Sequence, residues 1–348
     1  MAALCRALPK AELHAHLHGC VRLPTVASLA PRGVDVRCLL APHAADRSLA
    51  SCFAVFAAIH ATVTTLAALR RLALEVLEDF AADGVAYLEL RSTPRALQDA
   101  DAAGYIACVL RAFADFEAAQ LAARARLPLT PRLILSVDRS ASAREAEETA
   151  RLAVRLAGET AYVVGLDFSG NPTRGRFAEF TRAFEEARRA GLRTTVHTAE
   201  VEDAADTDAI LAFRPDRLGH ALTLTPTQLA RLRAAPIPIE LCPTSNKKTL
   251  GLANLTCHPT LRTLLEDDYP ISISTDDSTV FQTTSSRELQ LVAEACGLSA
   301  EAVAALALKP MDHVFERDAQ RVESLKAHFR RAAAEALGEY HRSVQSWW

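Results

Sequence analysis

A (β/α)8 barrel of the TIM type, within the α/β class, is the fold that this 348-residue sequence predicts. Short apolar runs alternate with alanine-rich amphipathic stretches along most of the chain, and eight of the apolar runs have the length of strands. Repeated strand–helix units favour a parallel sheet, and eight of them favour a closed barrel over an open sheet. Since no repeat, low-complexity run or linker divides the sequence, we expect one domain over residues 1–348.

The elements follow one another in regular order. The predicted strands are residues 12–17, 85–91, 132–137, 162–168, 193–197, 217–219, 237–241 and 271–274. The predicted helices are residues 66–83, 104–124, 143–156, 176–190, 225–235 and 258–267. In this order most of the predicted strands are followed by a helix, which is the arrangement of a (β/α)8 barrel.

Two segments depart from the regular alternation. Residues 20–67 form a long insertion after the first predicted strand, with Phe53, Phe56 and Ile59 at helical spacing. An insertion at the carboxyl end of a barrel strand lies over the barrel mouth, so we expect either a lid or a helix packed on the rim. The tail, residues 299–348, has a helical pattern and is expected to cover the outside of the barrel.

Composition excludes several classes of partner. The net charge is -3 and the pI is near 6.4, with no basic stripe, so neither nucleic acid nor an anionic membrane is an expected partner. No run of about 18 apolar residues could span a membrane, and the N-terminus lacks the features of a secretory signal. The 8 cysteines contain no Cys-x-x-Cys pair, which indicates reduced thiols in a cytoplasmic protein.

Histidines and an aspartate lie where several predicted strands end. His14 and His16 are two residues apart on the first strand, so their side chains point to the same face. His197 ends the fifth strand and Asp276 follows the eighth, which neighbours the first in a closed barrel. A lone histidine of this kind is more often a core or rim residue. The joint pattern instead predicts one Zn²⁺ bound by His14, His16, His197 and Asp276, because Zn²⁺ accepts imidazoles and carboxylates and leaves a position for water.

Glu200 lies three residues after His197, in His197-Thr-Ala-Glu200. Because the preceding run is strand-like rather than helical, Glu200 is expected in the loop after the strand, beside the metal and not bound to it. It is either a loop residue paired with a rim arginine or a proton carrier kept partly neutral by burial. His220, in Gly219-His220, ends the next predicted strand and points to the same barrel mouth.

Together, Leu13-His-Ala-His16, His197-x-x-Glu200, Gly219-His220 and Thr275-Asp-Asp277 resemble the adenosine deaminase family of metal-dependent hydrolases, over residues 8–317. The resemblance implies one Zn²⁺ bound by the four residues named above. It implies that hydroxide supplied by the metal adds to purine carbon 6, and that ammonia or an amine leaves. Glu200 would donate a proton to ring nitrogen 1, and His220 would orient the hydroxide. Asp277 would hold ring nitrogen 7, and the N–H of Gly170 would meet ring nitrogen 3.

Other enzyme classes fit the sequence less well. A cytidine-deaminase-type zinc site needs Pro-Cys-x-x-Cys, and here Cys242 precedes Pro243. A two-metal barrel hydrolase is expected to carry a bridging lysine on the fourth strand, whereas no lysine occurs between Lys10 and Lys247. A non-catalytic nucleoside-binding relative would be expected to lose a ligand or Glu200, and none is missing.

The substrate is predicted from His18, in His16-Leu-His18-Gly19. Members of the family that act on free adenosine commonly carry an acidic residue there, which would repel a 5′-phosphate, whereas a histidine can donate to one. Residues 89–95, 166–172 and 242–246 resemble the branch acting on N(6)-methyl-AMP, although that branch more often has Asn at position 18. His60 and Arg95 are either further phosphate contacts or rim residues.

The expected reaction is therefore the conversion of N(6)-methyl-AMP to IMP and methylamine, by a chain that acts as a monomer on a small-molecule substrate. The alternative is an adenosine deaminase that converts free adenosine to inosine. The two differ in whether the cavity accommodates a 5′-phosphate.

Overall fold

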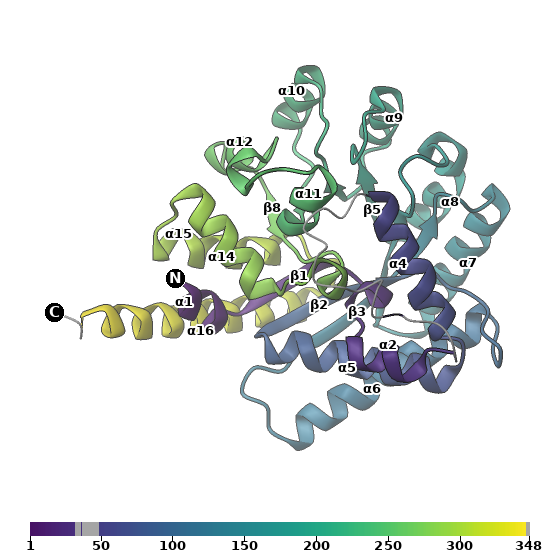
Figure 1. Ribbon diagram of the computed structural model, residues 1–348, viewed down its shortest axis with the longest axis horizontal. Helices are drawn as coiled ribbons and strands as arrows, with labels where there is room; N and C mark the ends of the chain where they lie inside the picture. The colour runs from purple at the N-terminus through teal and green to yellow at the C-terminus, as the bar shows by residue number, and fades with distance from the viewer. Residues whose placement is uncertain (32–35, 37–48, 346–348) are drawn as a thin grey trace.

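The computed structural model describes residues 1–31, 36 and 49–345 and has eight parallel strands in the order β1-β2-β3-β4-β5-β6-β7-β8 (Figure 1). They are β1 (Lys10–His16), β2 (Val85–Ser92), β3 (Thr130–Asp138), β4 (Val163–Ser169), β5 (Arg193–Thr198), β6 (Arg217–His220), β7 (Ile239–Leu241) and β8 (Ile271–Ile273). All eight strands expected from the sequence are present, with bounds that differ by a few residues. The (β/α)8 barrel prediction is confirmed.

The barrel closes beside β8 rather than through a long β1–β8 ladder. Ala15 and Asp276 form an isolated parallel bridge. The His16 N–H donates to the Asp276 carbonyl at 3.0 Å, and the Asp276 N–H donates to the His14 carbonyl at 2.8 Å. Barrel closure therefore brings Asp276 next to His14 and His16, as the sequence predicted.

Helices surround the sheet (Figure 1). Those that follow β2 to β7 in turn, together with the helix that precedes β2, are α5 (Leu66–Ala82), α6 (Ala102–Ala122), α7 (Ala143–Glu159), α8 (Phe177–Arg189), α9 (Ala204–Phe213), α10 (Pro226–Ala234), α11 (Pro243–Thr249) and α12 (Leu261–Glu266). The local sequence explains α7 well: Ser142 and Glu145 form a capping box, and a stripe that includes Ala146, Ala150, Ala153 and Ala157 is buried against the sheet.

The remaining helices lie before β1, within the insertion and after β8. They are α1 (Ala2–Ala7), α2 (Leu23–Leu29), α4 (Leu49–Thr62), α13 (Ser278–Phe281), α14 (Ser285–Cys296), α15 (Ala300–Leu308) and α16 (Ala319–Gln345), with 3-10 helices η1 (Leu17–Cys20), η3 (Leu255–Cys257) and η4 (Lys309–Asp312). The expected helical tail is confirmed as α15 and α16. Helices α1 and α16 lie side by side (Figure 1).

One predicted helix begins later in the structure than in the sequence prediction. The helix expected over residues 258–267 begins only at Leu261, because the His258 side chain accepts the N–H groups of Thr260 and Leu261 and so holds these residues in a turn. The described part of the insertion is η1, α2 and α4; residues 32–35 and 37–48, including Cys38, lie outside the described residues. The thiols of Cys5, Cys20, Cys108, Cys242, Cys257 and Cys296 are free.

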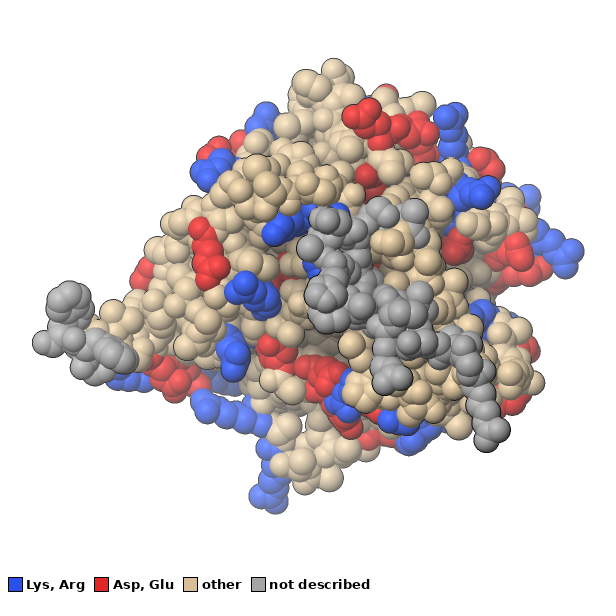
Figure 2. All heavy atoms as spheres, in the orientation of Figure 1, with Lys and Arg blue, Asp and Glu red and all other residues tan. Residues whose placement is uncertain are grey.

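No helix within the described residues is long and apolar enough to cross a membrane. On the face drawn in Figure 2, Lys and Arg side chains are interspersed with Asp and Glu side chains. The described surface of this face thus presents mixed charges.

The barrel interior is unusually polar. Branched apolar residues commonly fill such barrels, but here Glu89, Arg91, Arg217 and Glu240 are almost fully buried inside. Arg217 donates to Glu240 at 2.6 Å and to Glu89, and its guanidinium lies 3.5 Å from the centre of the Phe315 ring. Buried charges persist only when paired, so these ion pairs fix the layer directly beneath the barrel mouth.

We expect Gly165→Ala to destabilise the protein by about 1–3 kcal/mol, the usual cost of overpacking a core. A Cβ at Gly165, on β4, would lie 2.8 Å from Phe315 Cδ2 and 3.1 Å from the Arg193 carbonyl. Gly158→Ala in α7 is the control, since a Cβ there meets nothing within 4 Å and alanine should stabilise the helix by about 0.5–1 kcal/mol. Denaturant unfolding measures both; equal effects would contradict the close approach of Phe315.

Candidate active site

A cavity of about 450 Å³ opens at the carboxyl ends of the strands, where catalytic groups of this fold lie. Phe53 and Phe56 of α4 line it, so α4 forms one of its walls, while Ile59 is buried in the hydrophobic core. Three of the four expected metal ligands line the cavity: His16, His197 and Asp276. The fourth, His14, lies just beneath it and is fully buried.

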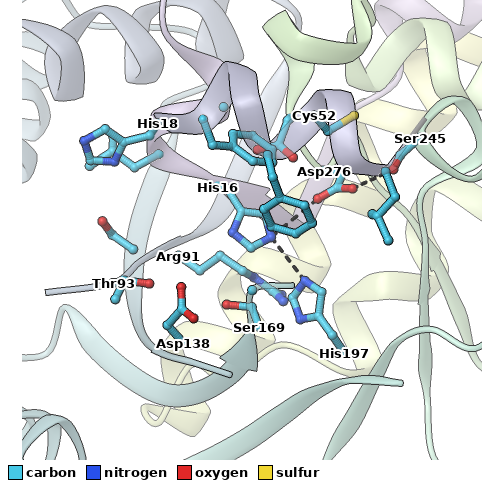
Figure 3. A pocket seen from close by; sticks show the side chains of 18 of the residues that line it. His16, His18, Cys52, Arg91, Thr93, Asp138, Ser169, His197, Ser245 and Asp276 are labelled. Atoms are coloured by element: carbon cyan, nitrogen blue, oxygen red, sulfur yellow. Dashed lines mark hydrogen bonds and ion pairs between the residues drawn. The ribbon is translucent and has the colours of Figure 1, made fainter. Parts of the chain in front are cut away.

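The four expected metal ligands meet at one point. Their ligand atoms all lie within 4.8 Å of one another. His16 Nε2 is 3.2 Å from His197 Nε2 and 3.4 Å from Asp276 Oδ1, and His14 Nε2 is 3.5 Å from the same oxygen. Figure 3 shows His16, His197 and Asp276 pointing toward one another. His14 Nε2 is buried and makes no hydrogen bond within the described structure, so the lone pair of this nitrogen in the neutral ring is available to a cation.

Buried carboxylates orient two of these histidines from behind. Glu240 Oε2 accepts from His14 Nδ1 at 2.6 Å, and Asp167 Oδ1 accepts from His197 Nδ1 at 3.1 Å. These bonds direct the Nε2 atoms of both rings toward the common point, an arrangement typical of metal-binding histidines. None of these partners was predicted from the sequence.

Arg91 joins the two carboxylates. Its guanidinium donates to Glu240 Oε2 at 2.8 Å, to Asp167 Oδ1 at 3.2 Å and to the Leu13 carbonyl at 2.6 Å. Burial opposes the ionisation of Glu240, but Arg91 and Arg217 outweigh it and hold its pKa well below the ordinary value. Arg91 also helps His197 to lower the pKa of Asp167 against the effect of burial, so it contributes to the charge of both supporting carboxylates.

Asp276 is held by both its side chain and its backbone. Ser245 donates to Asp276 Oδ2 at 2.7 Å, which leaves Oδ1 facing the histidines. Asp276 has φ 63°, and Ala199, His220 and Ala221 at the ends of β5 and β6 also have positive φ. Non-glycine residues in this region are strained and cluster at functional sites, so the strand ends adopt unfavourable conformations in order to direct these side chains.

The ionisation states of two ligand histidines differ. Burial lowers the pKa of His16 to about 3, which leaves a neutral imidazole. Burial and the charge of Arg91 lower the pKa of His14, but Asp276 and Glu240 outweigh them and raise it to about 9. The proton on His14 thus occupies the position in which a cation would bind.

Glu200 lies in the loop after β5, as predicted, with Oε2 3.7 Å from His220 Nε2. Its other oxygen, Oε1, is buried and has no hydrogen-bond partner within the described residues. Burial raises the pKa of Glu200 above its ordinary value. Among the described residues, no arginine forms an ion pair with Glu200, whose titratable neighbour is His220.

Asp277 also lines the cavity with a free oxygen, Oδ1, in the described structure. Burial, followed by the charge of Asp276, raises its pKa well above the ordinary value. Gly19 makes room for it: a Cβ on Gly19 would lie 1.6 Å from Asp277 Oδ1. The glycine after His18 is therefore required for the position of Asp277, a relation that the sequence did not reveal.

The remaining predicted contacts lie farther from the metal-ligand group. Gly170 follows β4 with φ 98°, and a Cβ there would lie 2.9 Å from Asp138 Oδ1. His18 and His60 line the cavity with ring centres 4.8 Å apart, and Figure 3 shows His18 well separated from His197 and Asp276. The cavity is thus elongated, with the metal-ligand group at one end.

Arg95 provides the positive charge at the His18 end. Its Nη2 donates to His18 Nε2 at 2.9 Å. Burial and then Arg95 lower the pKa of His18 well below its ordinary value, so His18 is neutral. A buried imidazole that accepts a hydrogen bond from a guanidinium does not bind a second proton, so the single hydrogen of His18 is on Nδ1.

The sequence is similar to those of known proteins over most of its length. The family model described as "Adenosine deaminase" matches residues 9–327. The chain is 34% identical over 330 residues to the adenosine deaminase-like protein of Drosophila melanogaster, covering 93% of this chain and 96% of that protein. It is 33% identical over 336 residues to the N6-methyl-AMP deaminase of Homo sapiens, covering 92% of each.

Solved structures agree. The Arabidopsis ADAL complexed with IMP superimposes with a TM-score of 0.85 at 32% identity, covering 96% of this chain and 98% of that one. A COG1816 amidohydrolase from Burkholderia ambifaria, with bound Zn, superimposes with a TM-score of 0.81 at 25% identity, covering 99% and 94%. Both similarities extend over the complete barrel.

We expect Arg91→Met to lower the free energy of unfolding by about 3–5 kcal/mol, because it leaves two buried carboxylates without their shared partner. Arg22→Met is the control. Arg22 pairs with Glu78 and Asp79 on the surface, where an ion pair contributes about 0–1 kcal/mol. Denaturant unfolding of both variants checks the difference, and similar losses would show that Arg91 does not hold the buried carboxylates.

Proposed function

We propose that this chain, which belongs to the adenosine deaminase family, catalyses the hydrolytic deamination of a 6-aminopurine nucleoside 5′-monophosphate, converting N(6)-methyl-AMP to IMP and methylamine. One observation carries the proposal: a single cavity holds the His–Asp metal-ligand group and Glu200 at one end and Arg95 with His18 at the other. The relatives named N6-methyl-AMP deaminase and the ADAL–IMP complex support the same substrate class.

One Zn²⁺ ion is the proposed cofactor, with His14, His16, His197 and Asp276 as its ligands. Three imidazole nitrogens and one carboxylate oxygen form a donor set that Zn²⁺ favours, and His14 Nε2 otherwise has no hydrogen-bond partner among the described residues. When bound, the ion supplies hydroxide near neutral pH by lowering the pKa of water. A neighbouring structure with bound Zn agrees with this choice of metal.

Three groups of the cavity suit the purine base. Ring nitrogens 1, 3 and 7 of a 6-aminopurine each present a lone pair and therefore require donors. Glu200 would donate to nitrogen 1 through its unpartnered oxygen, Asp277 to nitrogen 7, and the N–H of Gly170 to nitrogen 3. Because a carboxyl must keep its proton to donate, the burial of Glu200 is part of this recognition.

The proposed reaction proceeds by addition and elimination. Glu200 donates its proton to nitrogen 1 as the oxygen nucleophile forms a bond to carbon 6, so that the electron pair of the C=N bond passes to that nitrogen. The proton of the added oxygen passes to the methylamino nitrogen, the bond from carbon 6 to that nitrogen breaks, and methylamine leaves as the C=O bond of IMP forms. Overall, N(6)-methyl-AMP and water give IMP and methylamine.

The 5′-phosphate is proposed to bind at the His18 end of the cavity. Arg95 supplies the charge, and a phosphate would receive its charge-assisted hydrogen bonds. His60 supplies a neutral imidazole donor. His18 would hold Arg95 in place beside the phosphate, because its Nε2 accepts from Arg95 while its Nδ1 lies 3.5 Å from the Tyr105 hydroxyl. The second candidate, a deaminase of free adenosine, would need no cation here, so the position of Arg95 favours the monophosphate.

We expect Glu200→Gln to keep one Zn²⁺ per chain but to lose turnover by more than the roughly 10²–10⁴-fold typical of one acid–base group, because no other carboxyl in the described cavity is placed to replace it. Glu202→Gln is the control, since Glu202 is exposed and does not line the cavity. Metal analysis and steady-state rates measure both effects; near-normal turnover of the Glu200 variant would place the acid elsewhere.

We expect His18→Asp to reduce kcat/KM for N(6)-methyl-AMP at least about 100-fold more than for N(6)-methyladenosine. The new carboxylate would pair with Arg95 and face the phosphate, and like charges in a desolvated site cost several kcal/mol, at about 1.4 kcal/mol per factor of ten. His18→Asn adds no charge and should retain the preference for the monophosphate. If the wild type prefers the nucleoside, or if His18→Asp leaves the preference unchanged, the free-adenosine alternative is the better one.

A further inference from the structure

A chain of three buried side chains leads away from the active site: His220, Asn246 and His258. Asn246 Nδ2 lies 3.0 Å from His220 Nδ1, and Asn246 Oδ1 lies 3.1 Å from His258 Nε2. All three residues are almost completely buried, so no solvent competes for their hydrogen bonds. His258 lies in the turn before α12. Helix α10, strand β7 and helix α11 separate it from His220 in the sequence.

The direction of these hydrogen bonds is set at the His258 end. Its Nδ1 accepts from the backbone N–H of Thr260 at 3.3 Å and of Leu261 at 3.1 Å. A backbone amide can only donate, so Nδ1 carries no hydrogen. Burial lowers the pKa of His258 to about 4, so the ring is neutral at pH 7 and its single hydrogen is on Nε2, which donates to Asn246.

Asn246 transmits this direction. The oxygen and nitrogen of an amide side chain are assigned from their hydrogen bonds. The Asn246 Oδ1 also accepts from the backbone N–H of Cys242 at 3.3 Å. Since a backbone N–H can only donate, this second contact supports the same assignment. The amide nitrogen therefore faces His220 and donates to its Nδ1. Since that nitrogen accepts, the hydrogen of a neutral His220 is on Nε2, the atom that lies 3.7 Å from Glu200 Oε2.

We propose that Asn246 and His258 are positioning residues that fix the tautomer of His220, so that its Nε2–H is a permanent hydrogen-bond donor directed into the active site. The tautomer follows from the hydrogen bonds alone, whereas its catalytic consequence rests on the proposed function. Such a donor stabilises negative charge on the attacking oxygen, as an oxyanion-hole donor does.

This assignment also separates two groups of side chains that could hold a metal. One is His14, His16, His197 and Asp276; the other is His220, Cys242 and Asp276. A ring nitrogen that carries a hydrogen has no lone pair for a cation, so His220 Nε2 is not a ligand and the second group is excluded. For the same reason His220 does not remove a proton from water, which leaves Glu200 as the proton carrier.

The test is the ¹⁵N resonance of the His220 ring in the zinc-loaded protein, assigned with a His220→Gln variant. We expect Nε2 to be protonated and Nδ1 to be unprotonated. In Asn246→Asp the group facing Nδ1 can only accept, while the contacts with Cys242 and His258 can be kept. We expect the hydrogen to move to Nδ1, the zinc content to stay at one, and kcat to fall about 10²–10³-fold, the usual effect of losing one oxyanion-hole donor, with little change in KM.

His258→Asn is the second variant, because its shorter side chain can still accept from Thr260 and Leu261 but does not reach Asn246. We expect a mixture of the two His220 tautomers. Cys257→Ser, at an exposed neighbouring position, is the control and should leave the spectrum unchanged. An unprotonated Nε2 in the wild type, or an unchanged His220 spectrum in both variants, would overturn the inference; a tautomer change in a protein inactive on N(6)-methyl-AMP would instead contradict only the proposed function.

Discussion

The active site depends on two buried ion pairs, which Arg91 forms with Glu240 and with Asp167. The guanidinium lies between two carboxylates, and each carboxylate holds the Nδ1 atom of a different histidine, His14 on β1 or His197 on β5. Two strands on different sides of the barrel are thereby coupled through one cation. Burying such charges is costly unless every partner is present, so the arrangement is expected to be all-or-none: the histidines are preorganised when it is complete and misdirected when any member is lost.

Burial and neighbouring charges also set the protonation state of each carboxyl group in the cavity. Neighbouring carboxyls can therefore have different roles. Asp276 faces the histidines and receives a hydrogen bond from Ser245, and although burial opposes its ionisation, His14 and the other histidines outweigh burial and lower its pKa. Glu200 and Asp277 each have an unpartnered oxygen, and burial raises the pKa of both. In the proposed complex, Glu200 and Asp277 would donate to lone pairs of the 6-aminopurine, the His220 Nε2–H would face the attacking oxygen, and Asp276 would be an anionic ligand of the cation. Environment, not residue type, distinguishes these groups.

The sequence was sufficient to predict the barrel, its eight strands and the residues that meet at its mouth, because strand periodicity and barrel closure convert positions such as His14, His16 and Asp276 into spatial neighbours. It did not predict the partners behind them. Arg91, Asp167 and Glu240 are ordinary charged residues on separate strands, and only the register of the folded sheet brings them together. His258 was assigned to a helix that in fact begins three residues later, since a side chain that accepts backbone N–H groups has no signature in hydrophobic periodicity. The neutral state of His18 likewise depends on its burial and on a guanidinium 77 positions away.

The central claim, hydrolytic replacement of the 6-amino substituent of a nucleotide, is tested most directly by product analysis in ¹⁸O-labelled water. Purified zinc-loaded protein is incubated with N(6)-methyl-AMP, and in parallel with AMP and N(6)-methyladenosine, and the products are identified by mass spectrometry. We expect IMP that carries one ¹⁸O atom at carbon 6, one equivalent of methylamine per IMP formed, and much slower conversion of the nucleoside. Conversion of the free nucleoside alone, or IMP without incorporation of solvent oxygen, would contradict the account.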